Sequence, residues 1–225
     1  MDEFLRARQP EQREERRAQL LGTARTMLEG GTALRDLTLN ELARQAGMAK
    51  SNVYRYFESR EALLLDLLWS EWTAWFEGLA QDPPRRGSTP KALEALVRGL
   101  AKRLAARPLL CKLTAALPSV LEQNLSEARI GAFKRESLEF FGALATFLHT
   151  RVPALSEARY MQLLHDAVAL IVGLEPLAFP APAVARVLAC GEFEAFRKDF
   201  EGELARMLLA LAGVPPRRRV RLAGA

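Results

Sequence analysis

Apolar side chains recur at spacings of three and four residues along nearly the whole chain, and no long stretch alternates apolar and polar residues with period two. The first spacing is typical of one face of an α-helix, whereas period two is typical of a half-buried strand. We therefore predict an all-α fold without strands. The 225 residues, of which 49% are hydrophobic, suffice for a buried core and fit one or two domains.

Local signals set the ends of the first helices. A helix over residues 11–29 is expected to stop at the glycine pair that follows it. Thr38 and Glu41 have the spacing of a capping box, which predicts a short helix over 39–46. Gly47 would end that helix in a left-handed conformation, which satisfies the last carbonyl groups.

After a three-residue break, a second short helix is predicted over residues 50–56, and Ser59 is expected to cap a long helix that ends near residue 80. Val53 and Phe57 are four residues apart and would pack inward. The outward face of the short helix is then polar and aromatic: Lys50, Ser51, Asn52, Tyr54, Arg55 and Tyr56.

The proline-rich segment 82–89 cannot continue a helix, so we predict a linker there between domains 1–81 and 90–214. In the second domain prolines fall between or at the ends of the periodic stretches, as expected for a bundle. Its predicted helices cover residues 89–106, 109–116, 126–150, 156–173 and 192–212. Residues 215–225 are predicted to be a basic, mobile tail.

Charge and composition exclude several classes of protein. The net charge is +5, but four arginines lie in the tail, so residues 1–214 carry only +1. Any argument for nucleic-acid binding must therefore come from local pattern. Two cysteines and two histidines are too few for a disulfide framework or a zinc site of recognisable spacing. We expect neither a metal nor a cofactor.

No membrane partner is expected either. The longest uncharged apolar run in the second half, residues 167–174, is far shorter than the roughly 18 residues that a membrane span needs. Asp2 and Glu3 occupy positions where a secretion signal would be basic. We therefore expect a cytoplasmic protein.

Two short helices joined by a three-residue turn, the second with a polar outer face, are typical of DNA-binding proteins that place this second helix in the major groove. The same corner can also serve packing alone. The stretch from Thr38-Leu-Asn-Glu-Leu-Ala-Arg-Gln-Ala-Gly47 through Met-Ala-Lys-Ser-Asn-Val-Tyr-Arg-Tyr-Phe57 to Glu-Ser-Arg-Glu-Ala-Leu63 resembles the DNA-binding signature of the TetR family of bacterial transcriptional repressors.

This resemblance implies a three-helix DNA-binding domain, a larger helical effector-binding domain, and a homodimer that leaves a palindromic operator when a small molecule binds. The chain departs from the family pattern at two positions. Ala49 stands where the family usually has Ser at the start of the recognition helix, and Ser51 stands where many members have Gly. The first turn of that helix then lacks a capping oxygen.

The hypothesis for DNA contacts assigns two roles. Base edges would be contacted by Lys50, Ser51, Asn52 and Arg55, with Asn40 as a lesser candidate, because these side chains match the hydrogen-bonding groups of guanine and adenine. Phosphates would be held by Thr38, Tyr54, Tyr56 and Arg60. Packing is the alternative for both tyrosines. A charged mobile arm is the default interpretation of Arg6, Arg8, Arg13, Arg16 and Arg17, although they could reach the backbone or the minor groove.

A largely apolar effector is the predicted ligand of the second domain. The candidate contact residues are Trp72, Phe76, Leu113, Phe140 and His165, each with a core position as the alternative. For the dimer interface we favour helices 156–173 and 192–212, which are richer in apolar residues than one thin core needs. These residues are Leu163, Leu164, Ala167, Leu170, Ile171, Leu204, Leu208 and Leu211, and an internal core is the rival explanation.

Two other classes of function compete with a regulator. An enzyme is disfavoured because the sequence has no glycine-rich phosphate loop, no Gly-x-Ser-x-Gly elbow and no paired metal-ligand motif. A helical scaffold would use the same corner for protein contacts and would ignore DNA even at low salt. Activation instead of repression is a further alternative within the regulator class.

Overall fold

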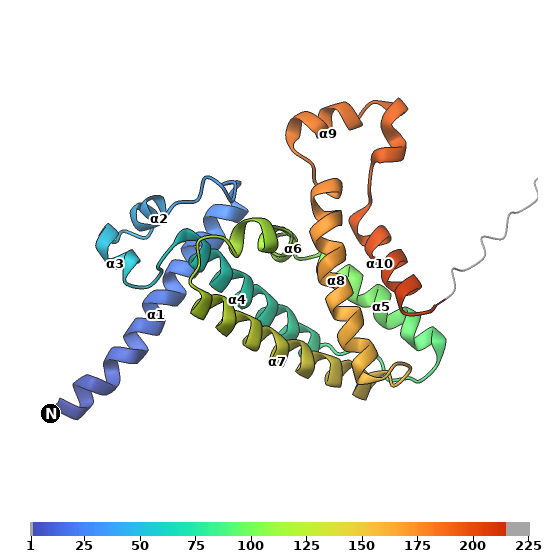
Figure 1. Cartoon of the computed structure of the whole chain (residues 1–225), viewed down its shortest axis with the longest axis horizontal. Helices are drawn as coiled ribbons and strands as arrows, with labels where there is room; N and C mark the ends of the chain where they lie inside the picture. The colour runs from blue at the N-terminus through green and yellow to red at the C-terminus, as the bar shows by residue number, and fades with distance from the viewer. Residues whose placement is uncertain (1, 215–225) are drawn as a thin grey trace, which may run out of the picture. The chain divides into compact units, whose positions relative to one another are not determined.

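The computed structural model describes the backbone of residues 2–214 and the side chains of residues 12–214. Helices make up most of the described chain and no strand occurs within it, so the all-α prediction is confirmed (Figure 1). The predicted tail 215–225 and the side chains of Arg6 and Arg8 lie outside the described residues.

The helices follow one another with short connections. In chain order they are α1 (Asp2–Glu29), α2 (Leu39–Gln45), α3 (Lys50–Tyr54), α4 (Arg60–Gln81), α5 (Pro90–Ala105), α6 (Pro108–Ala116), the π-helical turn η1 (Leu117–Leu121), α7 (Glu127–Arg151), α8 (Glu157–Ala178), α9 (Pro182–Leu188), the 3-10 turn η2 (Gly191–Phe196) and α10 (Phe200–Leu211).

Most helix starts are fixed by a side chain that accepts a hydrogen bond from the first turn. The Thr38 hydroxyl accepts from the Glu41 amide at 3.1 Å, and the Ser59 hydroxyl accepts from the Ala62 amide at 3.0 Å. Thr89 and Ser156 cap α5 and α8 in the same way. Each bond satisfies one of the amides that a helix leaves unpaired at its N-terminus. The predicted starts of these helices are confirmed.

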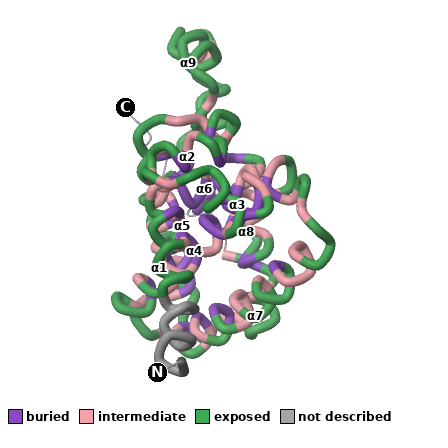
Figure 2. Tube along the Cα trace, turned by 90° about the vertical axis from the view of Figure 1, so that its left-hand side faces the viewer, coloured by how far each residue is buried: buried purple, intermediate pink, exposed green. Residues whose placement is uncertain are grey.

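The chain forms two compact units, and α4 contributes to both. The first unit comprises residues 1–74 with 116–130, and the second comprises residues 75–115 with 131–225. In the first unit, residues 61–68 of α4 are buried without interruption. A helix that is buried on all sides needs neighbours on every face. The segment therefore forms the centre of this unit (Figure 2).

The second unit is a bundle in which α10 packs against α5 and α8. The inward residues of α10 are Phe200, Leu204, Ala205, Leu208 and Leu209. Six of the eight residues predicted for a dimer interface are already buried here within one chain, and only Leu170 and Leu211 are not. The apolar excess of these helices is mainly internal core, which was the rival explanation.

Two helix predictions for the second half are wrong in their bounds, and one helix was not predicted. The predicted helix 192–212 is broken into η2 and α10, because Asp199 caps a new start by accepting from the Gly202 amide at 3.0 Å. The predicted helix 156–173 continues to Ala178 through Pro176. Proline costs less there because it lies in the last turn. Helix α9 was not predicted, and none of its residues is buried.

The first helix also differs from its prediction, since its backbone is helical from Asp2 instead of residue 11. Arg13, Arg16 and Arg17 therefore lie on a helix and not in a mobile arm. Arg17 in addition reaches across to α4.

By length and composition alone, one described helix could cross a membrane, or two if the bent pair formed by α5 with Pro108–Leu121 is counted as one span. The helix is α8, whose most apolar window has a mean hydropathy of 1.3. The core helix of a soluble protein has the same character, and six residues of α8 are buried against its neighbours. The uninterrupted apolar run 167–174 is only part of this helix, so its length alone does not indicate a possible span.

The two cysteines provide a test of the fold. Burial raises the pKa of Cys111 to about 12, and its thiol donates to the Leu104 carbonyl, whereas Cys190 is exposed. Only a thiolate reacts with alkylating reagents. We expect iodoacetamide to label Cys190 in the native protein and Cys111 only after unfolding, with Cys190→Ser as the control. Equal labelling of both cysteines in the native state would contradict the fold.

Candidate nucleic-acid interface

Helices α2 and α3 form a tight corner. The turn between them is closed by backbone hydrogen bonds from the Ala46 amide to the Leu42 carbonyl and from the Met48 amide to the Ala43 carbonyl, both 2.9 Å long. Gly47 has φ +64°, the left-handed conformation predicted for it. Leu42 and Val53 are fully buried, so the corner packs through a small apolar core.

The outer face of α3 is polar. Lys50, Ser51, Asn52 and Arg55 are exposed, and Val53 is the only buried residue of the helix. Tyr54 is 48% exposed, and the Lys50 ammonium lies 5.8 Å from the centroid of its ring. Tyr56 is half-buried. Ala49 provides no side-chain cap, as the departure from the family pattern predicts.

The other predicted DNA contacts lie at the start of α2 and of α4. Thr38 and Asn40 are exposed, although the Thr38 hydroxyl is engaged in its cap. The Glu41 carboxylate does not complete the capping box. It accepts from Arg44 and Gln45, and these hydrogen bonds, Arg44 first, lower the pKa of Glu41 to about 2.

Arg60 differs from the other predicted phosphate ligands because its guanidinium is engaged within the unit. Its Nε and Nη2 donate to the Glu61 carboxylate at 3.1 and 2.7 Å, and its Nη1 donates to the Arg35 carbonyl at 3.1 Å. Arg60 thereby holds the loop before α2 against the start of α4.

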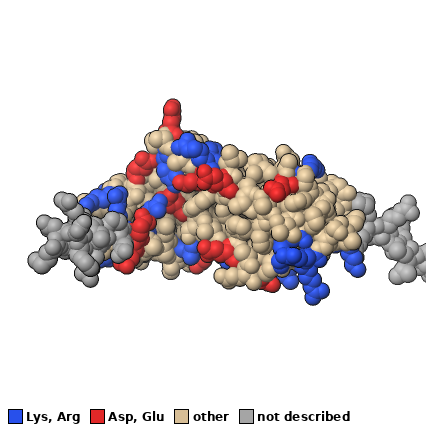
Figure 3. Space-filling model, turned by 90° about the horizontal axis from the view of Figure 1, so that it is seen from below, with Lys and Arg blue, Asp and Glu red and all other residues tan. Residues whose placement is uncertain are grey.

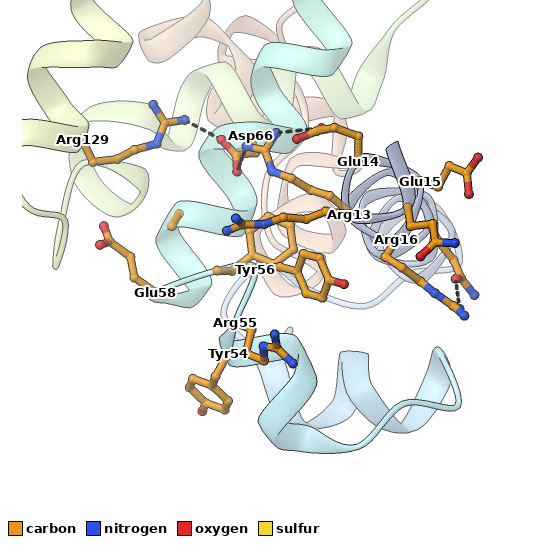
Figure 4. A pocket seen from close by; sticks show the side chains of 15 residues that line it. Arg13, Glu14, Glu15, Arg16, Tyr54, Arg55, Tyr56, Glu58, Asp66 and Arg129 are labelled. Atoms are coloured by element: carbon orange, nitrogen blue, oxygen red, sulfur yellow. Dashed lines mark hydrogen bonds and ion pairs between the residues drawn. The ribbon is translucent and has the colours of Figure 1, made fainter. Parts of the chain in front are cut away.

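A polar cleft of about 1550 Å³ adjoins α3. Its walls come from α1, from residues 54–58 and from Arg129 at the start of α7. Figure 4 shows Arg13, Arg55 and Tyr56 around the same opening. The sequence patterns did not reveal this cleft, because its walls are far apart along the chain.

Asp66 ties the walls of the cleft together. Its carboxyl group is only 8% exposed and accepts from the Arg17 guanidinium at 2.6 Å and from the Arg129 guanidinium. A buried carboxylate without a partner would be strongly destabilising. The two arginines therefore fix α1 and the first turn of α7 to α4. No sequence signal indicated this pairing, since Arg129 is 63 residues from Asp66.

A second buried carboxylate strengthens the same joint. Glu71 is 5% exposed and lies 2.7 Å from the guanidinium of Arg25, which also donates to the Ser70 hydroxyl at 3.3 Å. Helix α1 is thus bound to α4 at two places along its length. We call α1 and α4, joined by these ion pairs, the frame of the first unit. Helix α2 packs against α1 and against α3.

The predicted effector residues lie partly in a row of aromatic rings in the second unit. Phe76 makes edge-to-face contacts with Phe140 at 5.5 Å and with Phe147 at 5.7 Å. Phe141 continues the row from Phe140 to His165 at 5.5 and 5.7 Å between centroids. Phe76 and Phe140 are half-buried and His165 is exposed. Trp72 and Leu113 are buried, 7% and 0% exposed.

A helix-turn-helix corner with a polar, exposed second helix defines a class of DNA-binding proteins. Two family models match the chain. Residues 22–67 match the bacterial regulatory proteins of the tetR family, and residues 69–217 match the tetracyclin repressor-like C-terminal domain. The chain belongs to the TetR family and is a ligand-binding transcriptional regulator.

A solved structure of a regulator shares this fold, and further solved regulators are similar to the chain. The fatty acid degradation regulator FadR from Bacillus halodurans is 16% identical with a TM-score of 0.53, over 88% of this chain and 94% of that chain. FadR from Bacillus subtilis in complex with stearoyl-CoA is 17% identical with a TM-score of 0.49, over 87% and 96%. A TetR/AcrR-family regulator from Thermobifida fusca is 18% identical with a TM-score of 0.47, over 91% and 100%. No curated protein matches the chain.

The Asp66 joint can be tested by stability. We expect Asp66→Ala to lower the free energy of unfolding by about 1–3 kcal/mol, because two arginines lose their acceptor but can still reach water. Urea unfolding measures this change. The control is Arg44→Ala, which breaks only the exposed Arg44–Glu41 pair and should leave stability nearly unchanged. An equal loss in both variants would contradict the central role of Asp66.

Proposed function

We propose that this chain is a homodimeric repressor that binds a palindromic operator through α3 and leaves it when a small, largely apolar molecule binds the second unit. The polar face of α3 carries the proposal. Of the five residues of this helix only Val53 faces inward, so the others are available to a groove of DNA.

The residue roles follow from chemistry and exposure. Lys50, Asn52 and Arg55 would contact base edges, since Lys and Arg match guanine O6 and N7 and Asn matches adenine N6 and N7. Ser51 and Asn40, both exposed, are further candidates for such contacts. Phosphates would accept from the hydroxyl groups of Thr38, Tyr54 and Tyr56, which fixes the position of the protein on the duplex.

Arg60 would act mainly by positioning, because its three donor atoms are engaged with Glu61 and the Arg35 carbonyl. A direct phosphate contact would require it to give up one of these bonds. Arg13 and Arg16 on α1 are exposed beside the polar cleft. They would add contacts to the DNA backbone, and each such contact strengthens the dependence of binding on salt.

The effector would bind along the aromatic row. Phe76 and Phe140 provide apolar ring edges, and the exposed His165 at the end of the row provides one polar group that can orient a ligand. Leu113, which is buried in the second unit, would support this region from the core, whereas Trp72 belongs to the first unit. The ligand would act by favouring one tilt of α4, and a coupling of about 1–3 kcal/mol would reduce operator affinity roughly 5- to 150-fold.

The homodimer would form through α8, α9 and α10, close to the regions predicted from the sequence. Apolar side chains stay exposed there within one chain: Leu177, Phe179, Val184, Val187, Phe196 and Leu211. Exposed apolar residues gathered over neighbouring elements are typical of interfaces. A two-fold dimer would place the two α3 helices about 34–36 Å apart, one turn of DNA.

We further propose that the chain has no enzymatic activity and acts in the cytoplasm, where the operator lies. No group of His, Cys, Asp and Glu among the described residues is arranged to hold a metal ion. Displacement of a protein from DNA needs only differential binding and no covalent chemistry.

The decisive experiment is the selection of bound fragments from random double-stranded DNA, with and without apolar effectors. A palindromic product whose binding weakens with an effector supports the proposal. A product that binds only with an effector would indicate activation. Indifference to DNA even at low salt would favour a scaffold and contradict the proposal.

The two kinds of DNA contact can be separated by substitution. Arg55→Ala should cost about 1–3 kcal/mol at one base pair and relax specificity there. Tyr54→Phe removes only a hydroxyl group and should weaken all sequences alike, roughly threefold to tenfold. Titrations against the operator and its single-base-pair variants measure both. Identical behaviour of the two variants would reject the assignment of roles.

The dimer can be tested by charge insertion. We expect Val187→Glu and Leu177→Glu to convert the dimer to a monomer in sedimentation experiments, because each buries a carboxylate in an apolar interface. Leu138→Glu on α7, where the side chain is also exposed, should leave the dimer intact. Dimers of unchanged affinity in all three variants would place the interface elsewhere.

A further inference from the structure

A second cleft lies in the second unit, and none of the residues that line it is proposed for DNA or effector binding. Its volume is about 440 Å³, within the range of small-molecule sites. The walls are the segment between α4 and α5 on one side and residues 91–103 of α5 on the other. The cleft has a basic rim and an apolar floor.

The segment that forms one wall is held in place by backbone contacts. The Arg151 side chain donates to the Pro84 carbonyl at 3.1 Å, and the Gly87 amide donates to the Arg151 carbonyl at 3.1 Å. Arg103 donates to the Asp82 carbonyl at 2.7 Å. A Cβ atom on Gly87 would lie only 2.8 Å from the Ala92 Cβ, so the segment passes close against α5. The wall is therefore preorganised.

The rim carries positive charge without internal partners. Arg85, Arg86 and Lys91 are exposed and make no hydrogen bond or ion pair within the described part of the chain. Arg103 also lines the cleft, but its charge is compensated by Asp82. The first turn of α5 has no acidic residue, so the positive end of the helix dipole adds to the same potential.

The floor is apolar and has room for a ligand. Leu96 and Leu100 of α5 and Leu79 of α4 line it and are themselves buried. Gly99 lies between them, and a Cβ atom there would meet nothing within 4 Å. The glycine therefore leaves space that a larger residue would fill.

We propose that this cleft binds a phosphate group carried by an apolar body. The positive charge of three cations without internal partners is more than a ligand with one carboxylate would neutralise. It suits a dianionic phosphate, which Arg can hold through two parallel hydrogen bonds. The apolar body would lie over Leu96, Leu100 and Gly99. The source of this chemistry is either a free amphiphilic phosphate or the headgroup of a lipid.

The test uses the full chain and hexyl phosphate, with inorganic phosphate and hexanol as the two half-ligands, in isothermal titration calorimetry. We expect hexyl phosphate to bind at least about tenfold more tightly than either half-ligand. The double substitution Arg85→Ala and Arg86→Ala should remove this binding. The matched control is Arg98→Ala, which removes an exposed arginine of α5 that does not line the cleft.

Gly99→Met provides the second arm. Methionine is a better helix former than glycine, so thermal unfolding should show an unchanged or higher midpoint. We expect this variant to bind hexyl phosphate no better than inorganic phosphate, because the side chain fills the floor. If the folded variant loses the additional affinity that the hexyl chain provides, the apolar body of the ligand lies over Gly99.

Vesicles of phosphatidylcholine with and without phosphatidic acid distinguish the two sources. If the protein co-sediments with the acidic vesicles and the double variant does not, the ligand is a lipid headgroup. If the protein binds hexyl phosphate but does not co-sediment with the acidic vesicles, the ligand is a free amphiphilic phosphate. Hexyl phosphate binding no tighter than that of the half-ligands, or unaffected by both the double variant and Gly99→Met, overturns the proposal.

Discussion

The burial of three carboxylates along α4 is the constraint on which the DNA-binding unit depends. Glu61, Asp66 and Glu71 lie on a helix whose residues 61–68 are all buried, and each of the three is less than 9% exposed. A carboxylate in that position must be paired. Its arginine partners come from elsewhere in the fold, namely Arg17 and Arg25 of α1 and Arg129 of α7, while Arg60 pairs with Glu61 and also reaches the loop before α2. The pairs fix which elements surround α4.

This frame explains how a helix as short as α3 can be presented at the surface. Five residues without a side-chain cap are too few for a helix to be stable alone. Val53 is fully buried and Phe57 is only 1% exposed, so both anchor α3 to the core. The turn at Gly47 closes the corner between α2 and α3. The polar face adds no buried polar group to the core, because its side chains are exposed apart from the half-buried Tyr56. The sequence of α3 is free to serve recognition.

The elements that the sequence predicted well are those fixed by neighbours along the chain. Thr38, Gly47 and Ser59 act on residues only a few positions away, so their caps and turn were predicted correctly. Arg129 and Asp66 are 63 residues apart, and no local pattern can indicate that they meet. Helix α9 was not predicted because none of its residues is buried, so it shows no periodic apolar face. Helix α8 continues through Pro176 because a proline near the end of a helix removes few hydrogen bonds. The cleft at Gly99 likewise depends on a loop held by the distant Arg151.

Helix α4 is continuous across the boundary between the two units. The helix runs unbroken from Arg60 to Gln81, with no proline and with Gly78 as its one glycine. Any displacement of the part of α4 that lies in the first unit would move the three buried carboxylates with it. Breaking their ion pairs would leave uncompensated charge in the core, which costs far more than a small rotation of packed helices. The arginines and the helices that carry them should therefore follow α4, so that α1, α2 and α3 move as one body.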